Sequence, residues 1–340
     1  MNSHLIKNWI VRPVYVALLL AVVFHARTAS AVSLSPVRFE LSGNPGQLVT
    51  GEILITNEGK YSDFLYSSTA NFEAQGESGS PAFVEPKDGI GTWIDIQDSV
   101  SLEPGVSKTI PFSINIPKNA EPGGHFGVIF FGNTPKGSNQ VSVGSQTGAL
   151  VLLSVSGDVR EDAGLLSFNT KDKKFWYKTL PVTFEYRFKN DGGDRVKPQG
   201  KINIRNTAFI RTERLDANPV EGNVLPGSTR KFQIEWLEYS RPLDYLSPDG
   251  FFSKYWDNVV YEWKNFAIGL YSANLRIEYG SAPEKARDTA FFFVFPWELA
   301  IVLIIVILVL FFGGRALIRR YNRHIIAQAQ KGNMGGNTNA

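Results

Sequence analysis

One apolar segment near the C-terminus constrains what this chain can fold into more than any other feature. From Leu299 to Phe312 it has no charged residue, glycine or proline, and most of its residues are Ile, Leu or Val. With its flanks it reaches the ~20 residues that a helix needs to cross the hydrocarbon core of a bilayer. We therefore predict a transmembrane helix over residues 295–312, with the lipid bilayer as its partner. The alternative is a helix buried in a protein core.

The residues on either side of this segment predict its orientation. Four arginines follow it, with no acidic residue after Glu298: Arg315, Arg319, Arg320 and Arg323. Trp297 lies at the other end, where an amphipathic ring prefers the headgroup level. Because basic residues collect on the cytoplasmic side of a span, we predict a single-pass protein of the cell membrane. Residues 313–340 are then a basic cytoplasmic tail with a disordered end, and the preceding domains are extracytoplasmic.

The N-terminus agrees with export of the middle of the chain. Lys7 and Arg12 form a basic start, Val14–Phe24 is an apolar run, and Ala29-Ser30-Ala31 is a small-residue cleavage motif. The run is too short to span a bilayer, so residues 1–31 are predicted to be a secretory signal peptide, cleaved after Ala31 with Ala29 as the second small residue of the site. An uncleaved anchor is the alternative.

The distribution of charge excludes one class of partner. The whole chain has 35 Lys and Arg against 32 Asp and Glu, a formal net charge of +3. Three of the basic residues precede the cleavage site and five follow the predicted span, so the exported region alone is mildly acidic. Such a region lacks the basic footprint of a nucleic-acid-binding protein. The chain also has no cysteine, so its exported domains must be held by their cores. This absence favours a bacterial cell surface.

Alternating apolar residues and proline–glycine turns predict β-structure in the exported region. Leu48–Thr56 and Val106–Ile116 alternate apolar with polar or small residues, and Phe126–Phe131 and Leu150–Val155 are denser apolar runs. Turn signals such as Glu103-Pro104-Gly105 separate these segments. We predict an all-β fold, with a first immunoglobulin-like, antiparallel β-sandwich over residues 32–160.

Residues 161–294 repeat landmarks of the first region in the same order. The corresponding pairs are Glu52–Gly59 with Val182–Gly193, Leu102–Val106 with Leu225–Ser228, and Gly124-His125-Phe126 with Gly269-Leu270-Tyr271. Such self-similarity predicts a second copy of the same sandwich. Phe126 and Tyr271 are interpreted as packing residues, as in the tyrosine corner of immunoglobulin-like folds.

An aromatic-rich insertion near residues 238–268 interrupts the second β pattern. Phe252, Trp256, Val259, Val260 and Trp263 occur at helical spacing, which predicts a short amphipathic helix over Phe251–Asn265. In one interpretation this helix covers an open edge of the sandwich and buries Trp256 and Trp263. In the other, the two tryptophans contact the membrane or a partner protein.

The sequence offers little for catalysis. Of four histidines, only His125 lies in the exported region, and nucleophilic triads and most transition-metal sites need histidine or cysteine. Acidic pairs such as Asp95 with Asp98 and Asp191 with Asp194 lie in predicted turns, where aspartate is common for backbone reasons. We predict no catalytic, cofactor-binding or metal-binding residue, and therefore a protein that is not an enzyme.

With these residues in view, the layout resembles that of the WxL-interacting surface proteins of Gram-positive bacteria. The most specific stretches are Leu34–Leu41 with Gly46–Asn57, and Pro122–Phe131, which are similar to the start and a late strand of that family's first, peptidoglycan-binding-type domain. The second region is similar in order and position. The resemblance implies a non-enzymatic surface protein that faces the cell wall.

Together these observations predict a membrane-anchored bacterial cell-surface protein. Its non-catalytic β-sandwich domains are expected to bind cell-wall polymer (peptidoglycan) or another surface protein in a structural or adhesive role. The alternative is an accessory or chaperone-like subunit of a membrane-bound export or surface-assembly complex, which holds a strand of its partner.

Overall fold

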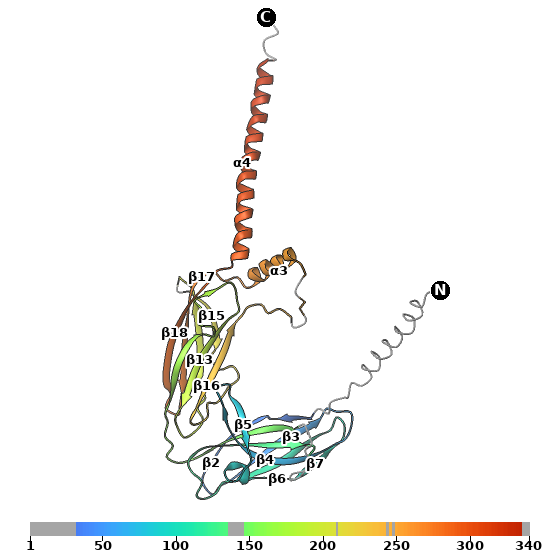
Figure 1. Cartoon of the computed structure of the whole chain (residues 1–340), viewed down its shortest axis with the longest axis vertical. Helices are drawn as coiled ribbons and strands as arrows, with labels where there is room; N and C mark the ends of the chain where they lie inside the picture. Colours follow the sequence, from blue (N-terminus) through green and yellow to red (C-terminus); the bar gives the residue numbers. More distant parts are fainter. Residues whose placement is uncertain (1–31, 135–145, 209, 243–244, 247–248, 335–340) are drawn as a thin grey trace, which may run out of the picture. The chain divides into compact units, whose positions relative to one another are not determined.

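The computed structural model describes residues 32–134, 146–208, 210–242, 245–246 and 249–334 of the 340-residue chain. Most of the described chain is β-strand, and one long helix, α4 (Trp297–Met334), follows the last strand (Figure 1). Two compact units are present: the first extends to Asp162 and includes the short segments Asn190–Arg195 and Leu225–Ser228, and the second contains the rest. The predicted all-β class, with two tandem immunoglobulin-like sandwiches and one C-terminal apolar helix, is confirmed.

Ten strands and one short helix build the first sandwich. The strands are β1 (Val32–Ser35), β2 (Arg38–Gly43), β3 (Leu48–Asn57), β4 (Asp63–Gln75), β5 (Ser80–Val84), β6 (Ile94–Ile96), β7 (Ser99–Leu102), β8 (Ser107–Asn115), β9 (Gly123–Gly132) and β10 (Gln146–Val155). One sheet has the order β1-β3-β8-β6, and the other has the order β2-β10-β9-β4-β5 with β7 also paired to β4. The sequence did not predict the helix α2 (Ile90–Trp93), because a single turn is too short to show helical periodicity.

The second sandwich also has two sheets. Its strands are β11 (Ala163–Thr170), β12 (Trp176–Tyr177), β13 (Val182–Asn190), β14 (Gln199–Arg205), β15 (Arg211–Asp216), β16 (Ser228–Trp236), β17 (Gly269–Tyr279) and β18 (Glu284–Val294). The strand orders are β11-β13-β16 and β12-β18-β17-β14-β15. The helix α3 (Phe251–Lys264) lies in the connection between β16 and β17.

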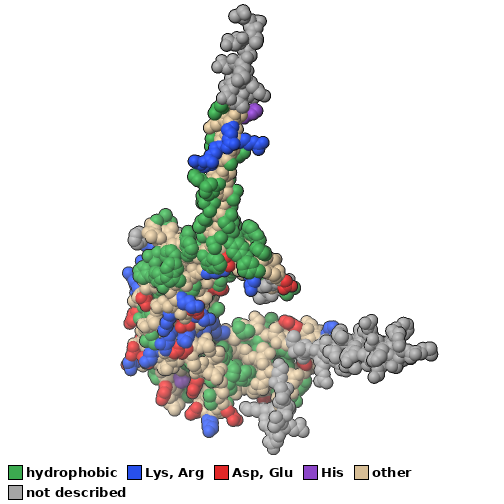
Figure 2. All heavy atoms as spheres, turned by 45° about the horizontal axis from the view of Figure 1, so that its top comes forward, with side chains coloured by type: hydrophobic (Ala, Val, Ile, Leu, Met, Phe, Trp, Pro, Cys, Tyr) green, Lys and Arg blue, Asp and Glu red, His purple; other side chains and the backbone are tan. Residues whose placement is uncertain are grey.

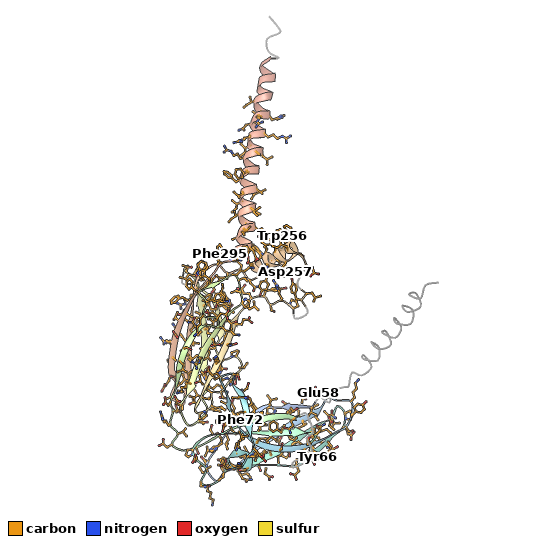
Figure 3. All side chains as sticks on the ribbon, viewed as in Figure 1. Glu58, Tyr66, Phe72, Trp256, Asp257 and Phe295 are labelled. Carbon is orange, nitrogen blue, oxygen red and sulfur yellow. The ribbon has the colours of Figure 1, made fainter. Side chains whose placement is uncertain are left out.

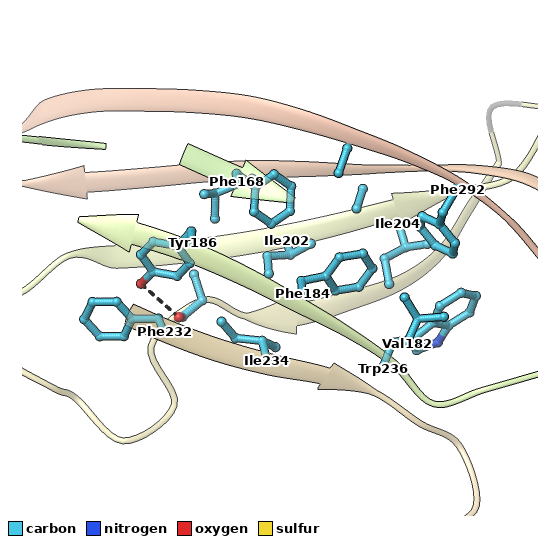
Figure 4. Packing of buried hydrophobic residues seen from close by; sticks show 14 of the residues in the cluster. Phe168, Val182, Phe184, Tyr186, Ile202, Ile204, Phe232, Ile234, Trp236 and Phe292 are labelled. Carbon is cyan, nitrogen blue, oxygen red and sulfur yellow. Dashed lines mark hydrogen bonds between the residues drawn. The ribbon is translucent and has the colours of Figure 1, made fainter. Parts of the chain in front are cut away.

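Strict alternation along β13 explains how the second core forms. Val182, Phe184, Tyr186 and Phe188 are fully buried, whereas the residues between them are partly exposed. They meet inward-facing side chains of the other strands, among them Phe232, Trp236 and Phe292 (Figure 4). Burial of each large apolar side chain contributes about 1.5–3 kcal/mol. The Tyr186 hydroxyl donates to the Ala217 carbonyl at 3.0 Å, so this buried polar group has a partner.

The strand orders show that the two sandwiches share one topology. The series β1-β3-β8 corresponds to β11-β13-β16, and the series β2-β10-β9-β4 corresponds to β12-β18-β17-β14. Equivalent glycines keep the same backbone geometry: Gly105 (φ 71) before β8 and Gly227 (φ 66) before β16 both adopt positive φ. The predicted internal repeat is therefore confirmed at the level of topology.

A buried asparagine at equivalent strand ends marks the repeat in atomic detail. The Asn57 side chain at the end of β3 accepts from Gly59 N at 2.8 Å and donates to Tyr61 O at 2.7 Å. Asn190 at the end of β13 accepts from Gly192 N at 2.9 Å and donates to Asp194 O at 2.7 Å. Both side chains are fully buried. Each satisfies the backbone of a turn that would otherwise leave polar groups unpaired.

The prediction of a purely antiparallel sandwich is wrong in one respect. β2 pairs parallel to β10, and β12 pairs parallel to β18. In the first unit, β1 pairs with β3 in one sheet, and the chain then passes into the other sheet as β2. The opening strand is thus divided between the two sheets, and its second half runs alongside the last strand of the unit.

The boundaries of the C-terminal helix differ from the predicted 295–312. The Phe295 N–H donates to Tyr177 O at 2.9 Å and so extends the sheet, while Ala300 N donates to Pro296 O at 3.0 Å in the first helical turn. Proline is well tolerated at a helix start. The first N–H groups of a helix have no acceptor within the helix, so no hydrogen bond is lost where proline lacks its N–H. The helix also continues through Gly313 and Gly314 to Met334. Its segment Trp297–Ile326 is long and apolar enough to cross a membrane.

Two consecutive phenylalanines of β18 provide a test of this core. Phe292 is fully buried and stacks on Tyr271 at 5.6 Å between ring centroids, whereas Phe291 is 59% exposed. We expect Phe292→Ala to lower the free energy of unfolding of the second sandwich by about 3–5 kcal/mol, because it leaves a cavity. Phe291→Ala is the matched control and should change it far less. Urea unfolding of the full chain in detergent, followed by tryptophan fluorescence, measures both. Equal losses in the two variants would contradict this packing.

Candidate membrane-proximal site

The two copies of the sandwich differ most in one connection. In the first unit, residues 116–122 alone link β8 to β9, whereas residues 237–268 link the equivalent strands β16 and β17. The longer connection ends at Gly269, which pairs with Val294, the last residue of β18. The insertion therefore returns to the sheet at the end from which α4 begins. Figure 3 shows Trp256, Asp257 and Phe295 near the start of α4.

The helix predicted in this insertion is present with nearly the predicted boundaries. α3 spans Phe251–Lys264 and begins after Gly250, whose φ of 90° ends the preceding loop. Its last turn is closed by Asn265 N, which donates to Tyr261 O at 3.0 Å. The Asn265 side chain also bonds both backbone groups of Tyr239, at 2.9 and 3.1 Å, and so joins the two ends of the insertion.

One face of α3 packs against the first turn of α4. The Tyr255 hydroxyl donates to Glu298 O at 3.0 Å, and Asn258 Nδ2 donates to Glu298 Oε1 at 3.2 Å. Leu299 N donates to Glu262 Oε2 at 2.7 Å. The first N–H groups of a helix have no partner within the helix, so the Glu262 carboxylate caps α4 from a separate element. The positive end of the helix dipole favours a carboxylate at this position.

Glu262 and Glu298 form a buried acidic pair beside one lysine. Glu262 is 0% exposed and Glu298 5% exposed. Lys178 Nζ makes an ion pair with Glu298 Oε2 and lies 4.0 Å from Glu262 Oε1. Burial, together with the neighbouring Glu298 carboxylate, raises the pKa of Glu262 to about 7, although Leu299 N–H and Lys178 act in the opposite direction. The pair therefore retains a proton at mildly acidic pH.

A second face of α3 is held by the first part of the insertion. Arg241 Nη2 pairs with Asp257 Oδ2 at 2.9 Å, and its guanidinium lies 4.4 Å from the centroid of the Tyr261 ring. The Tyr245 hydroxyl also donates to Asp257, and this hydrogen bond raises the pKa of Tyr245. Lys264 Nζ lies 4.2 Å from the centroid of the Tyr239 ring. α3 is therefore fixed on two sides.

The third face of α3 is apolar and uncovered. Phe252, Trp256, Val260 and Trp263 are 78%, 55%, 49% and 66% exposed. The interpretation in which the helix buries Trp256 and Trp263 over a sandwich edge is thus wrong. The buried residues of α3 are Val259 and Glu262, which lie on the face toward α4. Further exposed apolar residues flank the helix: Phe266, Ile268, Leu270, Phe295 and Trp297.

The other residues predicted from the sequence lie as follows. Trp297 is the first residue of α4, is half exposed, and has Lys178 Nζ 5.3 Å from its ring centroid. The four predicted topology determinants are all exposed on α4: Arg315, Arg319, Arg320 and Arg323. Ala29 and Ala31 lie outside the described residues. The structure brings Trp256, Trp263 and Trp297 to one end of the second sandwich and leaves the arginines farther along α4.

The residues considered for chemistry have structural surroundings. His125 Nε2 lies 2.9 Å from Glu121 O, and its ring contacts Trp93. Tyr271 is buried in the second core, and its hydroxyl accepts from Ile268 N at 3.2 Å, in keeping with a packing role. Among the described residues, no three His, Cys, Asp or Glu side chains lie close enough to hold a metal ion.

Sequence reasoning missed the cluster of Lys178, Glu262 and Glu298. One signal was present: Glu298 is an acidic residue at the start of an otherwise apolar span. A second was Glu262, which follows Val259 by three residues and therefore shares its face of α3. Neither signal identifies the partner, because Lys178 lies in a distant part of the chain.

The raised pKa of Glu262 predicts how pH acts on the contact between α3 and α4. The ordinary value is 4.5, so between pH 4.5 and about 7 the folded chain holds a proton that the unfolded chain has lost. This contribution to stability is complete below pH 4.5 and is lost as pH rises through about 7. Hydrogen-exchange protection of residues 251–264, corrected for intrinsic rates, should fall between pH 5 and pH 8.

Glu262→Gln should remove most of this pH dependence, because the amide does not titrate. Glu278→Gln is the control, since that side chain is 60% exposed. A pH profile that is unchanged in the Glu262→Gln variant would show that another group is responsible.

Comparison with known proteins identifies no family. No family model matches the chain, and no curated protein matches it. Among solved structures, the class 5 fimbriae chaperone CfaA is 12% identical with a TM-score of 0.36, over 76% of this chain and 99% of that one.

Two further structures are similar to the same degree. The CsuC–CsuE chaperone–tip adhesion subunit complex of Acinetobacter baumannii Csu pili is 11% identical with a TM-score of 0.35, over 77% of this chain and 98% of that one. The E. coli chaperone DraB is 9% identical with a TM-score of 0.34, over 77% of this chain and 97% of that one. Identities and TM-scores this low assign neither a family nor a function, and the resemblance to WxL-interacting proteins stays a prediction.

Proposed function

We propose that the chain is a single-pass membrane protein whose two β-sandwiches bind a cell-wall polymer or another surface protein outside the cytoplasm. The observation that carries this proposal is the direct continuation of β18 into α4. Only Phe295 and Pro296 separate the strand from the candidate span Trp297–Ile326. In this proposal the second sandwich is held at the membrane surface and binds its partner there, as an anchored domain.

The charge pattern along α4 supports the orientation. The exposed arginines Arg315, Arg319, Arg320 and Arg323 form the basic band beyond the apolar part of the helix in Figure 2. The sandwiches lie before the opposite end of the span. Basic residues are retained on the cytoplasmic side, so the sandwiches are extracytoplasmic in this proposal.

A specific observation favours a protein partner as a second candidate. β16 lies at the edge of the order β11-β13-β16, whereas the equivalent strand β8 has β6 on its outer side. Among the described strands, β16 therefore has a neighbour on one side only. From Lys231 to Trp236 the strand alternates regularly, with Phe232, Ile234 and Trp236 buried and Lys231, Gln233 and Glu235 exposed. A regular open edge accepts an extended segment by strand addition, which gives main-chain hydrogen bonds to the partner.

The absence of cysteine from the chain makes its topology directly testable. Ser78→Cys places a thiol on an exposed turn of the first sandwich, and Asn322→Cys places one on the basic side of α4. In intact cells, a membrane-impermeant maleimide should label Ser78→Cys, whereas Asn322→Cys should react only after lysis. The wild-type chain is the unlabelled control. Reaction at Asn322→Cys in intact cells would reverse the proposed orientation.

A binding experiment separates wall polymer from a protein partner. Full-length chain in detergent should be retained by purified peptidoglycan if the sandwiches bind cell-wall polymer. A photo-cross-linking residue at Glu235 on β16 should instead capture a protein in membranes if strand addition occurs. The same residue at the exposed position Glu278, on the central strand β17, is the control. If the chain is not retained and no Glu235-specific cross-link forms, both polymer binding and strand addition are contradicted.

A further inference from the structure

The uncovered face of α3 is a compact apolar stripe. Phe252, Trp256, Val260 and Trp263 follow one another at intervals of three or four residues, so they lie on one side of the helix. All four side chains are exposed. Contiguous apolar surface of this kind on a folded protein marks a site of interaction with another apolar surface.

Contacts on both sides of the stripe hold α3 in the orientation that exposes it. Asn258 and Glu262 tie one neighbouring face to Glu298 and Leu299 of α4. Arg241 ties the other neighbouring face through Asp257. Because both sides are held by hydrogen bonds and an ion pair, α3 cannot rotate to bury its apolar stripe without breaking these contacts.

The contacts with α4 set the position of the stripe relative to the span. Glu298 and Leu299 belong to the first turn of α4, at the end of the apolar segment that is nearest the sandwich. Trp297 at this end is a residue type that prefers the headgroup level. α3 is therefore fixed where the bilayer surface begins, and exposed apolar side chains continue from α3 onto α4 in Figure 2.

The composition of the helix fits this position. Tryptophan and phenylalanine on one side, with lysine on the remaining surface, are characteristic of helices that lie in the plane of a membrane interface. Helical spacing places Lys254 on the side opposite Trp256 and Trp263. Lys264 lies off the stripe as well, against Tyr239.

We infer that α3 is an interfacial membrane helix, whose stripe of Phe252, Trp256, Val260 and Trp263 is buried among the headgroups and upper acyl chains of the leaflet next to the sandwiches. The occupant of the stripe is lipid, because the stripe is continuous with the apolar surface of the span. This contact is additional to the span, and it fixes the tilt of the second sandwich on the membrane. The inference rests on α4 crossing the bilayer, as proposed above.

Spin labels on single cysteines test the depth of α3 directly. The full chain is reconstituted into bilayers of equal parts phosphatidylcholine and phosphatidylglycerol, with one label at Val260→Cys. Lys254→Cys on the opposite side of the helix is the matched control, and Val306→Cys within α4 reports on the span. Collision of each label with oxygen, which concentrates in lipid, is compared with collision with a water-soluble nickel chelate.

We expect the ratio of oxygen to nickel collisions to be several-fold higher at Val260→Cys than at Lys254→Cys, and highest at Val306→Cys. If the ratio is high at Val306→Cys but as low at Val260→Cys as at Lys254→Cys, α4 crosses the bilayer but α3 lies in water, and the inference fails. If Val260→Cys is immobile and shielded from both reagents, a protein surface covers the stripe and the inference also fails. If the ratio at Val306→Cys is low, α4 does not cross the bilayer and the proposed function is contradicted as well.

Discussion

The connection from sheet to helix at Phe295 and Pro296 is the constraint on which the structure around α3 and the start of α4 depends. The Phe295 N–H still belongs to the sheet, through Tyr177 O, while the Pro296 carbonyl already accepts the first helical bond from Ala300. No flexible linker can therefore be inserted between sandwich and helix without breaking one of these bonds. The elements packed at this point, including α3 and the pair of Glu262 and Glu298, therefore have a fixed position relative to the start of α4.

The shared topology explains what the two sandwiches have in common, and the exceptions show where they differ. Both units have an opening strand that is divided between two sheets, and both have a glycine with positive φ before β8 or β16. Both also have a turn held by a buried asparagine, Asn57 or Asn190. These features satisfy backbone groups and set strand order, so they are required by the fold itself. In the first unit β6 covers the strand equivalent to β16, and the connection equivalent to the insertion is only residues 116–122. Features that the fold does not require are the ones on which we base our proposals of function.

The sequence predicted local structure well and contacts poorly, for a physical reason. Alternation along Val182–Asn190 and helical spacing along Phe251–Lys264 are properties of one segment, and both elements are present with almost the predicted ends. Periodicity says that Trp256 and Trp263 share an apolar stripe, but it does not say whether protein or lipid covers that stripe. The ion pair of Lys178 with Glu298 joins distant segments, and no local pattern records such a meeting. The division of the opening strand into β1 and β2 was not predicted for the same reason. The sheet to which each half belongs depends on the distant strand with which it pairs.

The pairing of β18 also has a mechanical consequence. All eleven residues of β18, Glu284 to Val294, pair with β17, and the strand leads straight into α4. Hydrogen bonds in an antiparallel ladder stand perpendicular to the strands. In the proposed membrane-anchored arrangement, a pull along β18 from α4 would load this ladder in shear and would stretch many bonds at once. The pairing that joins the second sandwich to α4 thus resists extraction under tension, as the proposed role of a membrane anchor requires.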